Sequence, residues 1–360
     1  MPPLKNKALL TFKPDMEDAA KRWEAYWQRE LTDRPVVRAE CWKDGFTPKK
    51  IVGYGYYENV HSDIDELLDN ALYNAGGRYY AGESIPNYFS SFGPDEIAAF
   101  CGGTLQWHED SMGTNWSAPF VEDWETALPL ALDREHPLWL RMVTLAEKSA
   151  ERFGGKLLSF NVDYHSNMDI LLAARGAENL CMDLLDAPEL IDRAMENARA
   201  IFKELWDETR RICQKDRDGF YYDGYSEQSV CVLSCDFCCM VGQEMFRRWV
   251  LPTLEYEASL VDHSIYHWDG PRALTHYEDL MSVSKIHTLS FVPDPFERHM
   301  KYVDLYKDIQ SRGKSVSVWG PPDELKLLHR ELDPTKTMYM AQVETPAEAD
   351  AILDWFAKNT

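Results

Sequence analysis

Short runs of β-branched and aromatic residues alternate along the chain with longer amphipathic stretches. Such alternation is typical of strand–helix repeats around a parallel sheet. Eight runs predict strands, which are Pro35–Trp42, Ile85–Ser91, Leu157–Tyr164, Gly219–Tyr225, His263–Trp268, Ile286–Val292, Ser315–Trp319 and Thr337–Val343. We therefore predict an α/β fold, and specifically a (β/α)8 (TIM) barrel.

Apolar residues at helical spacing predict helices over Pro137–Phe153 and Met168–Cys213. The second stretch should break near Asp186-Ala187-Pro188, because proline is tolerated only in the first turn of a helix. A further helix is predicted over Asp15–Leu31, before the first strand, where we expect it to cap the bottom of the barrel.

The chain shows no linker, repeat or low-complexity tract that would divide it. We therefore expect a single domain, with residues 1–34 as an N-terminal helical extension and residues 35–360 as the barrel. We interpret the long aromatic segment 43–82 as an insertion after the first strand. A length of 360 residues, 45% of them hydrophobic, is sufficient for one barrel of this size.

The formal net charge of −22 excludes several kinds of partner. The negative electrostatic field of such a protein repels phosphate backbones and anionic headgroups, so we expect neither a nucleic acid nor a membrane as partner. The first residues contain no apolar core of a signal peptide, and no stretch approaches the roughly 18 apolar residues of a membrane span. We expect a cytoplasmic protein.

Polar and aromatic side chains occur where the predicted strands end. In a barrel the active site lies at the carboxyl ends of the strands, where the following loops converge. We therefore expect a small-molecule substrate to contact Glu40, Trp42, Asn87, Tyr88, Asp163, Tyr222, Trp268 and Trp319.

His267 and Asp269 come at the end of the run SIYHWDGP, from Ser264 to Pro271. Side chains two residues apart share a face of a strand, so the two should project together. A histidine and a carboxylate at a barrel mouth can bind a metal ion, or act as a base and its orienting group. The structural alternative is a hydrogen-bonded histidine at the start of a loop.

A second polar cluster follows the third predicted strand, in the segment from Asn161 to Asp169. Charged groups are costly to bury unless they are paired, so this segment should cap the next helix or line the pocket. We expect Asp169 to be a cap or a partner of Arg175, and His165 to contact substrate. His165 and Asp223, the latter at the end of the fourth predicted strand, are candidate catalytic residues.

Cys231, Cys235 and Cys238 have the C-x3-C-x2-C spacing of thiolates that hold a radical-type iron–sulfur cluster. That motif normally follows the first strand of its barrel, whereas here it would follow the fourth. We therefore expect no cluster, and predict that Cys238 packs as a small apolar group. Cys235, at the barrel mouth, is a candidate metal ligand beside His267.

Two consecutive runs, Ser234–Glu255 and Ser264–Leu274, resemble the corresponding region of the uroporphyrinogen decarboxylase superfamily. In that family a Met-Phe helix ending in Leu-Pro precedes a strand that ends in His-x-x-Gly. Weaker matches are Ile85–Phe100 followed by Gly102-Gly103, Asp163–Asp169 with Arg175-Gly176, and Gly313-Lys314. The resemblance extends from about Pro35 to the end, and implies a barrel related to the corrinoid- and zinc-linked methyltransferases.

This resemblance also implies a divalent metal ion, with zinc as the expected one. In the methyltransferase branch, zinc is held by a His-x-Cys pair, at the positions of His267 and Asp269, and by a cysteine near the last strand. Here Asp269 replaces the first thiol, and Glu344 is the acidic residue near the last strand. Carboxylate oxygens are competent ligands, so His267, Asp269, Cys235 and Glu344 form the expected set.

The function implied is transfer of a methyl or other one-carbon group on a small organic substrate, with cobalamin arriving on a corrinoid carrier protein. A monomer or homodimer is expected. Uroporphyrinogen itself is excluded, because the segment Arg34–Trp42 offers only Arg38 to a polyanionic substrate. Two alternatives stay open. One is a metal-free decarboxylase or lyase with Asp223, His165 or Asp236 as the acid, and the other is a non-catalytic barrel that binds a corrinoid or another ligand.

Overall fold

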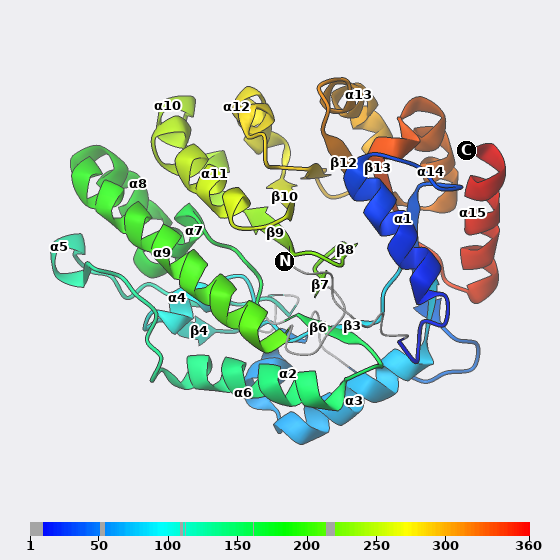
Figure 1. Cartoon of the computed structure of the whole chain (residues 1–360). Coiled ribbons are helices and arrows are strands. Elements are labelled where there is room, and N and C mark those ends of the chain that lie inside the picture. The colour runs from blue at the N-terminus through cyan, green and yellow to red at the C-terminus, as the bar shows by residue number, and fades with distance from the viewer. Residues whose placement is uncertain (1–9, 51–54, 109–110, 112, 161, 214–219) are drawn as a thin grey trace.

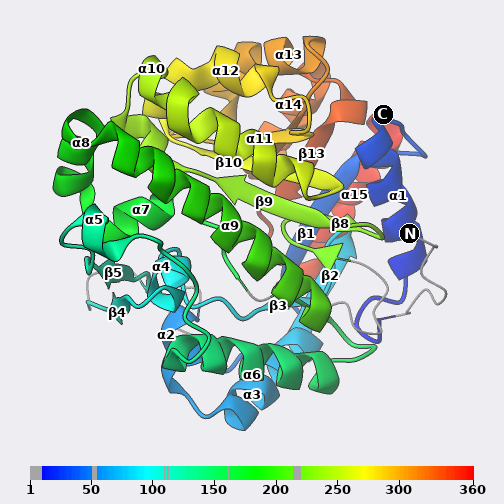
Figure 2. The same cartoon turned by 60° about the vertical axis from the view of Figure 1, so that its left-hand side comes forward.

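The computed structural model describes residues 10–50, 55–108, 111, 113–160, 162–213 and 220–360. Helices surround a mostly parallel sheet in a mixed α/β architecture, as Figures 1 and 2 show from two sides. Within these ranges, no helix combines the length and the apolar character that crossing a membrane requires.

The main sheet has seven strands in the order β2-β1-β13-β12-β11-β10-β9. All neighbours in it are parallel except β2, which runs antiparallel to β1 at one edge. Its strands are β1 (Val36–Trp42), β2 (Arg78–Gly82), β9 (Val230–Ser234), β10 (His263–Asp269), β11 (Thr288–Val292), β12 (Ser315–Gly320) and β13 (Thr337–Ala341). Most positions of β9 to β13 are buried, as in a parallel sheet covered on both faces.

Three smaller sheets complete the strand inventory of the described ranges. Strands β3 (Asn87–Phe89) and β6 (Leu158–Phe160) form a parallel pair. Strands β4 (Thr104–Gln106) and β5 (Trp116–Ala118) are antiparallel, and so are β7 (Phe220–Tyr221) and β8 (Tyr225–Ser226).

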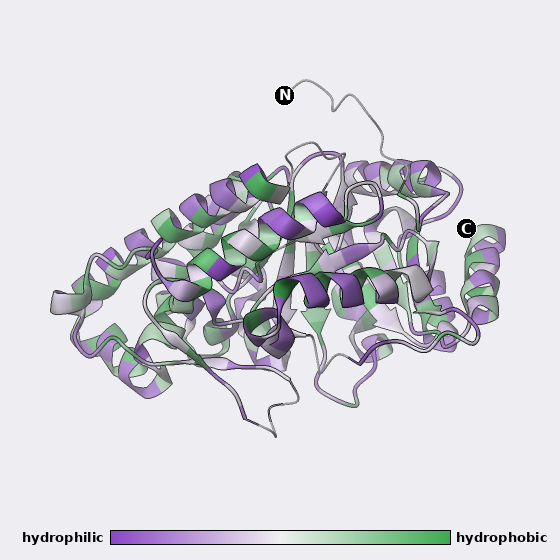
Figure 3. Ribbon diagram, turned by 90° about the horizontal axis from the view of Figure 1, so that it is seen from below, coloured by the Kyte–Doolittle hydropathy of each residue, from purple (hydrophilic) through white to green (hydrophobic). Residues whose placement is uncertain are grey.

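Most helices follow a strand and cover the sheets from outside (Figure 1). Hydrophobic and hydrophilic residues alternate along the long helices, as expected for elements with one buried face (Figure 3). The helices are α1 (Met16–Gln28), α2 (Tyr56–His61), α3 (Ile64–Gly77), α4 (Glu96–Phe100), α5 (Trp124–Ala127), α6 (Pro137–Arg152), α7 (Met168–Arg175), α8 (Ala177–Asp186), α9 (Pro188–Cys213), α10 (Gln243–Met245), α11 (Leu251–Ser259), α12 (Tyr277–Ser282), α13 (Val303–Ser311), α14 (Pro322–Glu331) and α15 (Pro346–Asn359).

Helix α1 lies against the amino-terminal ends of the strands. The Tyr26 hydroxyl shares a 2.7 Å hydrogen bond with that of Thr288, the first residue of β11. The Trp27 ring stacks on His263, the first residue of β10, at 4.5 Å between centroids, and its Nε1 donates to the Tyr225 carbonyl. These contacts place α1 against the amino-terminal ends of β10 and β11.

One predicted strand is wrong. The stretch predicted as the strand Gly219–Tyr225 folds, where described, into the short β7–β8 hairpin, and Asp223 at its turn has a positive φ of 54°. The Tyr222 amide donates to the Gly224 carbonyl and closes the turn. The parallel strand at this point of the chain is β9, Val230–Ser234, which pairs with β10. An Asp-Gly pair favours tight hairpin turns, and this preference outweighs the strand propensity of the flanking tyrosines.

The other seven predicted strands are present. β10 and β12 each extend one residue further than predicted, whereas β1, β3, β6, β11 and β13 are shorter than predicted. The helix predicted over Met168–Cys213 breaks before Pro188 as expected, and it also breaks at Gly176, whose φ is 82°. Positive φ is accessible to glycine without a steric penalty, so the chain can change direction between α7 and α8 at this position.

Candidate active site

Two segments at the carboxyl ends of β6 and β9 bring a histidine and two aspartates together. His165 lies in the loop after β6, Asp169 in the first turn of α7, and Asp236 begins the 3-10 turn η2 (Asp236–Met240) after β9. One ligand atom from each of the three lies within 4.8 Å of the others. His165 Nδ1 is 3.6 Å from Asp236 Oδ2 and 3.8 Å from Asp169 Oδ2.

The opposite edge of the His165 ring faces a third carboxylate. His165 Nε2 lies 3.7 Å from Asp163 Oδ2, while Asp163 Oδ1 accepts a 2.7 Å hydrogen bond from the Tyr222 hydroxyl. The side chains of His165 and Asp163 retain 18% and 16% of their accessible surface. The imidazole is therefore held between carboxylates at both nitrogens, and is still within reach of a ligand.

This environment changes the acidity of His165. Burial lowers its pKa, but the negative charges of Asp163, Asp236 and Asp169 outweigh burial and raise the pKa to about 9. The ring is accordingly protonated at neutral pH when no cation is bound. Because a metal binds only the neutral imidazole, binding at this nitrogen must release a proton.

Asp169 holds the two segments together. Its two oxygens accept hydrogen bonds of 2.8 Å from the amides of Asp236 and Phe237, the first residues of η2. Asp169 therefore acts as a cap, as expected, but it caps η2 and not the helix that contains it. Arg175 pairs with Asp183 at 2.7 Å rather than with Asp169. Burial, followed by the charge of Asp236, raises the pKa of Asp169.

The donor set suits a divalent ion. Asp236 Oδ1 is buried and has no hydrogen-bond partner among the residues that the structure describes. An unpaired buried carboxylate oxygen is costly, and a cation would satisfy it. Imidazole nitrogens and carboxylate oxygens are also ligands that zinc accepts in proteins.

His267 and Asp269 lie beside this cluster, at the carboxyl end of β10. The ring centroids of His267 and His165 are 6.4 Å apart. The pKa of the Asp269 carboxyl is raised by partial burial and by the charge of Asp236. The structure therefore brings both predicted strand-tip residues to the neighbourhood of His165, Asp169 and Asp236.

The remaining predicted metal ligands are placed differently. Cys235 is 2% exposed, and its thiol, whose pKa is raised by burial and by Asp169, lies outside the three-residue group. Glu344 is exposed and, together with Arg38 and Glu40, lines a cavity of about 540 Å³. Cys231 is part of β9, and Cys238 is buried in η2.

Asp223 has a structural partner. Its Oδ1 lies 2.5 Å from Nη1 of Arg38 on β1, and the same guanidinium donates to the Asp223 carbonyl at 2.9 Å. The pair ties the β7–β8 turn to the sheet, so the structure places this candidate catalytic residue in an ion pair outside the His165 cluster.

The predicted substrate-binding residues lie in several different places. Asp163 and Tyr222 lie at the His165 cluster, and Trp319 lines a cavity at the ends of β10 to β13. Trp42, Asn87 and Tyr88 line a different cavity, of about 560 Å³, beside α2 and α3. Glu40 is paired with Arg78 at 3.1 Å. Trp268 is fully buried, and its Nε1 donates to the Ala273 carbonyl, so it belongs to the core.

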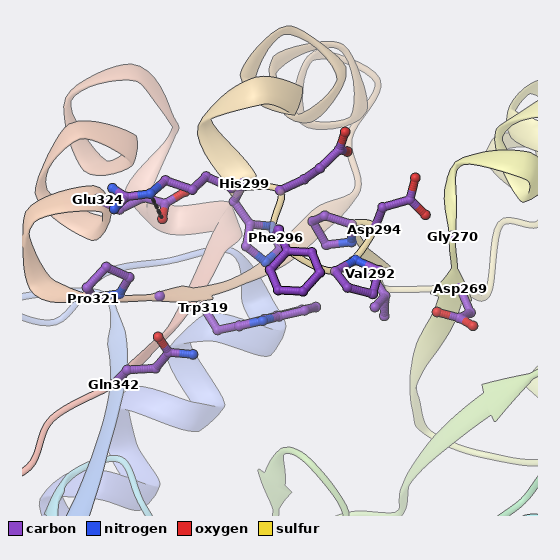
Figure 4. Close-up of a pocket in the computed structure, with 15 residues that line it drawn as sticks. Asp269, Gly270, Val292, Asp294, Phe296, His299, Trp319, Pro321, Glu324 and Gln342 are labelled. Atoms are coloured by element: carbon purple, nitrogen blue, oxygen red, sulfur yellow. Dashed lines mark ion pairs between the residues drawn. The ribbon is translucent and has the colours of Figure 1, made fainter.

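A cavity of about 760 Å³ opens where β10, β11, β12 and β13 end, and Figure 4 shows it. Asp269 forms part of its wall, and we name it the Asp269 cavity. Its lining consists of Asp269, Gly270, Val292, Pro293, Asp294, Pro295, Phe296, Glu297, Arg298, His299, Trp319, Gly320, Pro321, Glu324 and Gln342.

Sequence reasoning missed two fully buried glutamates that brace the loop carrying His165. Glu96 on α4 accepts a 2.7 Å hydrogen bond from the Asp163 amide, and Glu257 on α11 accepts one of 3.2 Å from the Asn167 amide. An acidic residue beside an apolar run, as in Glu96-Ile-Ala-Ala-Phe, is the signal that could have identified the first of them.

Comparisons with known proteins add one finding. No protein-family model matches the chain, and no curated protein matches it. Its fold is similar to that of a solved methyltransferase. That structure is a methyltransferase from Methanosarcina mazei, with a TM-score of 0.62 over 95% of this chain and 98% of that chain. The two sequences are 12% identical, so the match shows a shared fold.

Proposed function

We propose that this chain is a barrel enzyme that transfers a methyl group on a small organic substrate with the help of a bound divalent metal ion. The observation that carries the proposal is the convergence of His165, Asp169 and Asp236 at the carboxyl ends of two strands. The similarity in fold to a methyltransferase supports the reaction class.

The barrel itself is part of the proposal. Strands β1 and β9 to β13 form one parallel series, and β3 and β6 form a second parallel pair. Placing β3 and β6 between β1 and β9 gives the eight strands of a (β/α)8 barrel in chain order. Residues 1–34 are then the N-terminal extension and residues 35–360 the barrel, as a divergent member of the uroporphyrinogen decarboxylase superfamily.

In this proposal His165 Nδ1 and the carboxylates of Asp169 and Asp236 hold the ion, which we take to be zinc. When bound, such an ion lowers the pKa of a coordinating thiol or hydroxyl group, which then attacks a methyl group more readily. Asp163, itself held by Tyr222, orients the imidazole through its other nitrogen, which is the usual role of a carboxylate behind a metal-binding histidine.

The methyl group moves between the substrate and a corrinoid, which we propose is presented by a separate carrier protein. His267 lies beside the metal ligand His165, and Asp269, two residues further along β10, forms part of the wall of the Asp269 cavity. They are therefore positioned to contact the substrate end that faces the ion.

The test is an anaerobic assay with methylcobalamin as methyl donor and a panel of small thiols, in the presence of zinc. We expect the methylcobalamin spectrum to disappear with at least one thiol, and the rate to fall by at least about 100-fold in His165→Ala. His61→Ala, on α2 outside the cluster, is the matched control and should retain the parent rate. Absence of transfer to every thiol by the metal-loaded parent would refute the proposal.

The pKa of His165 favours one other function. A histidine whose pKa is raised to about 9 carries a proton at neutral pH, and can deliver it as a general acid without a metal. This is the chemistry of a metal-free decarboxylase or lyase, with Asp236 as the second candidate acid. Release of carbon dioxide from a screened carboxylic acid, at an unchanged rate in the presence of a chelator, would establish it.

A further inference from the structure

The Asp269 cavity has aromatic walls. Trp319 is half-buried, and the centroid of its ring lies 4.1 Å from that of the His299 ring, at an interplanar angle of 78°. Phe296, in the loop after β11, is fully exposed. Figure 4 shows Trp319 and Phe296 on one side of this space and Asp269 on the other.

The charge of the cavity is negative. Among its lining carboxylates, Glu297 pairs with Lys301 and Glu324 lies 4.0 Å from Arg298. Asp269 and Asp294 form no ion pair with a lysine or arginine among the described residues. Arg298 is the cationic residue of the lining, and it is shared with Glu324 and Asp323. The charge of Asp294 is therefore left uncompensated, while Asp269 faces His267 and His165.

His299 adds an unpaired polar atom to this wall. His299 is 2% exposed, and its Nδ1 shares a 2.6 Å hydrogen bond with the Tyr306 hydroxyl. Its Nε2 has no hydrogen-bond partner in the described ranges. Burial lowers the pKa of His299 to about 4, so the ring is neutral and adds no positive charge to the cavity.

The loop that carries Phe296 is held in an unusual backbone conformation. Phe296 has a φ of 75°, which a side chain of this size rarely adopts. Such strain persists where the surrounding structure imposes it, and it clusters at ligand clamps. Here its effect is to present an aromatic ring to solvent at the rim of a cavity with uncompensated negative charge.

We propose that the Asp269 cavity binds an organic ammonium cation, with the positive group held between the faces of Trp319 and Phe296 and the carboxylates of Asp269 and Asp294. Aromatic faces attract cations through their quadrupoles, and quaternary ammonium ligands are recognised in this way. A volume of about 760 Å³ suits an organic ligand and is far larger than a bare metal ion needs.

The position of Asp269 links this site to the metal ligands. A substrate with an ammonium group against Trp319 and a thiol or hydroxyl group at its other end would have that second group on the side of Asp269 that faces His267 and His165. The identification of this cation as the substrate of methyl transfer rests on the proposed function. The binding site itself is independent of it.

The experiment is a calorimetric titration of the metal-free full-length protein with choline, and separately with its neutral isostere 3,3-dimethylbutan-1-ol. We expect choline to bind and the alcohol to bind at least about tenfold more weakly, because the two differ in charge and hardly in shape. Trp319→Leu and Asp294→Asn should each weaken choline binding by about three- to tenfold, and Phe296→Ala by about threefold.

Two control variants should bind choline like the parent. Asp354→Asn removes one exposed charge on α15, and Leu185→Ala removes an exposed apolar side chain on α8. If Trp319→Leu fails to fold, Asp294→Asn and Phe296→Ala still decide the question, since both residues are exposed.

Equal binding of choline and the alcohol, or parent-like binding by Asp294→Asn and Phe296→Ala, would overturn the inference. Choline binding without any methyl transfer would uphold the site and refute the proposed function, whereas methyl transfer without choline binding would do the reverse.

Discussion

Glu257 Oε1 accepts a hydrogen bond of 3.2 Å from the amide of Asn167, and so fixes the end of the loop that carries His165. The glutamate is fully buried, and its other oxygen has no partner among the described residues. Burial raises the pKa of Glu257 to about 8, aided by the charge of Asp169. The loop is therefore braced by a carboxyl group that is protonated at neutral pH.

This shift predicts a pH dependence of stability. A carboxyl group whose pKa rises from 4.5 to about 8 on folding stabilises the protein fully below pH 4.5, and that contribution is lost as the pH rises through 8. Glu257→Gln keeps the shape and cannot ionise. Relative to this variant, the parent should lose about 3 kcal/mol of unfolding free energy between pH 5 and pH 8.

Urea denaturation of both proteins at pH 5, 6.5 and 8 measures this difference. Glu255→Gln, an exposed position on the same helix, should show no comparable change relative to the parent. A constant difference between the parent and Glu257→Gln at all three pH values would show that Glu257 is ionised in the folded protein throughout.

Asn167 combines backbone strain with side-chain hydrogen bonds. Its φ is 60°, its Nδ2 donates to the Val250 carbonyl, and its Oδ1 accepts from the Met168 amide. Asn167→Ala loses both bonds and keeps the strain, so we expect a loss of about 3 kcal/mol. Asn167→Gly relieves the strain and should lose only about 1–2 kcal/mol. Thermal unfolding ranks the two, and the reverse order would contradict this account.

The Arg38–Asp223 pair is predicted to be structural. Asp223→Ala leaves the guanidinium of Arg38, whose side chain is only 14% exposed, without its partner, and should cost about 2–3 kcal/mol of stability. The double variant Arg38→Met, Asp223→Ala should recover part of that loss. The affinity for metal should be unchanged in both variants. If Asp223→Ala kept the stability of the parent but lost methyl transfer, Asp223 would be a catalytic residue and this prediction would be wrong.

Most strands could be predicted from the sequence, because a buried parallel strand is a short apolar run with a clear end. The run from Ser264 to Pro271 predicted both β10 and the neighbouring positions of His267 and Asp269. The Asp223-Gly224 turn was misinterpreted, because the flanking tyrosines also have strand propensity, and β9 was missed as a consequence.

The site was less accessible to prediction, because it is made by contacts between distant segments. His165 and Asp169 were recognised as polar groups after a strand, but their meeting with Asp236 depends on the bonds from Asp169 to the η2 amides. The cavity wall at Phe296 and His299 depends on a loop conformation that local patterning does not encode.

The most direct test of the central claim is the metal content of protein purified without chelators and then supplied with zinc, measured by elemental mass spectrometry. We compare the parent with His165→Ala and Asp236→Asn, and use Asp354→Asn as the control. The account predicts about one zinc per chain in the parent and the control, and at least a tenfold loss of affinity in the other two. Zinc retained in both site variants, or a parent that binds none, would contradict a metal centre at His165, Asp169 and Asp236.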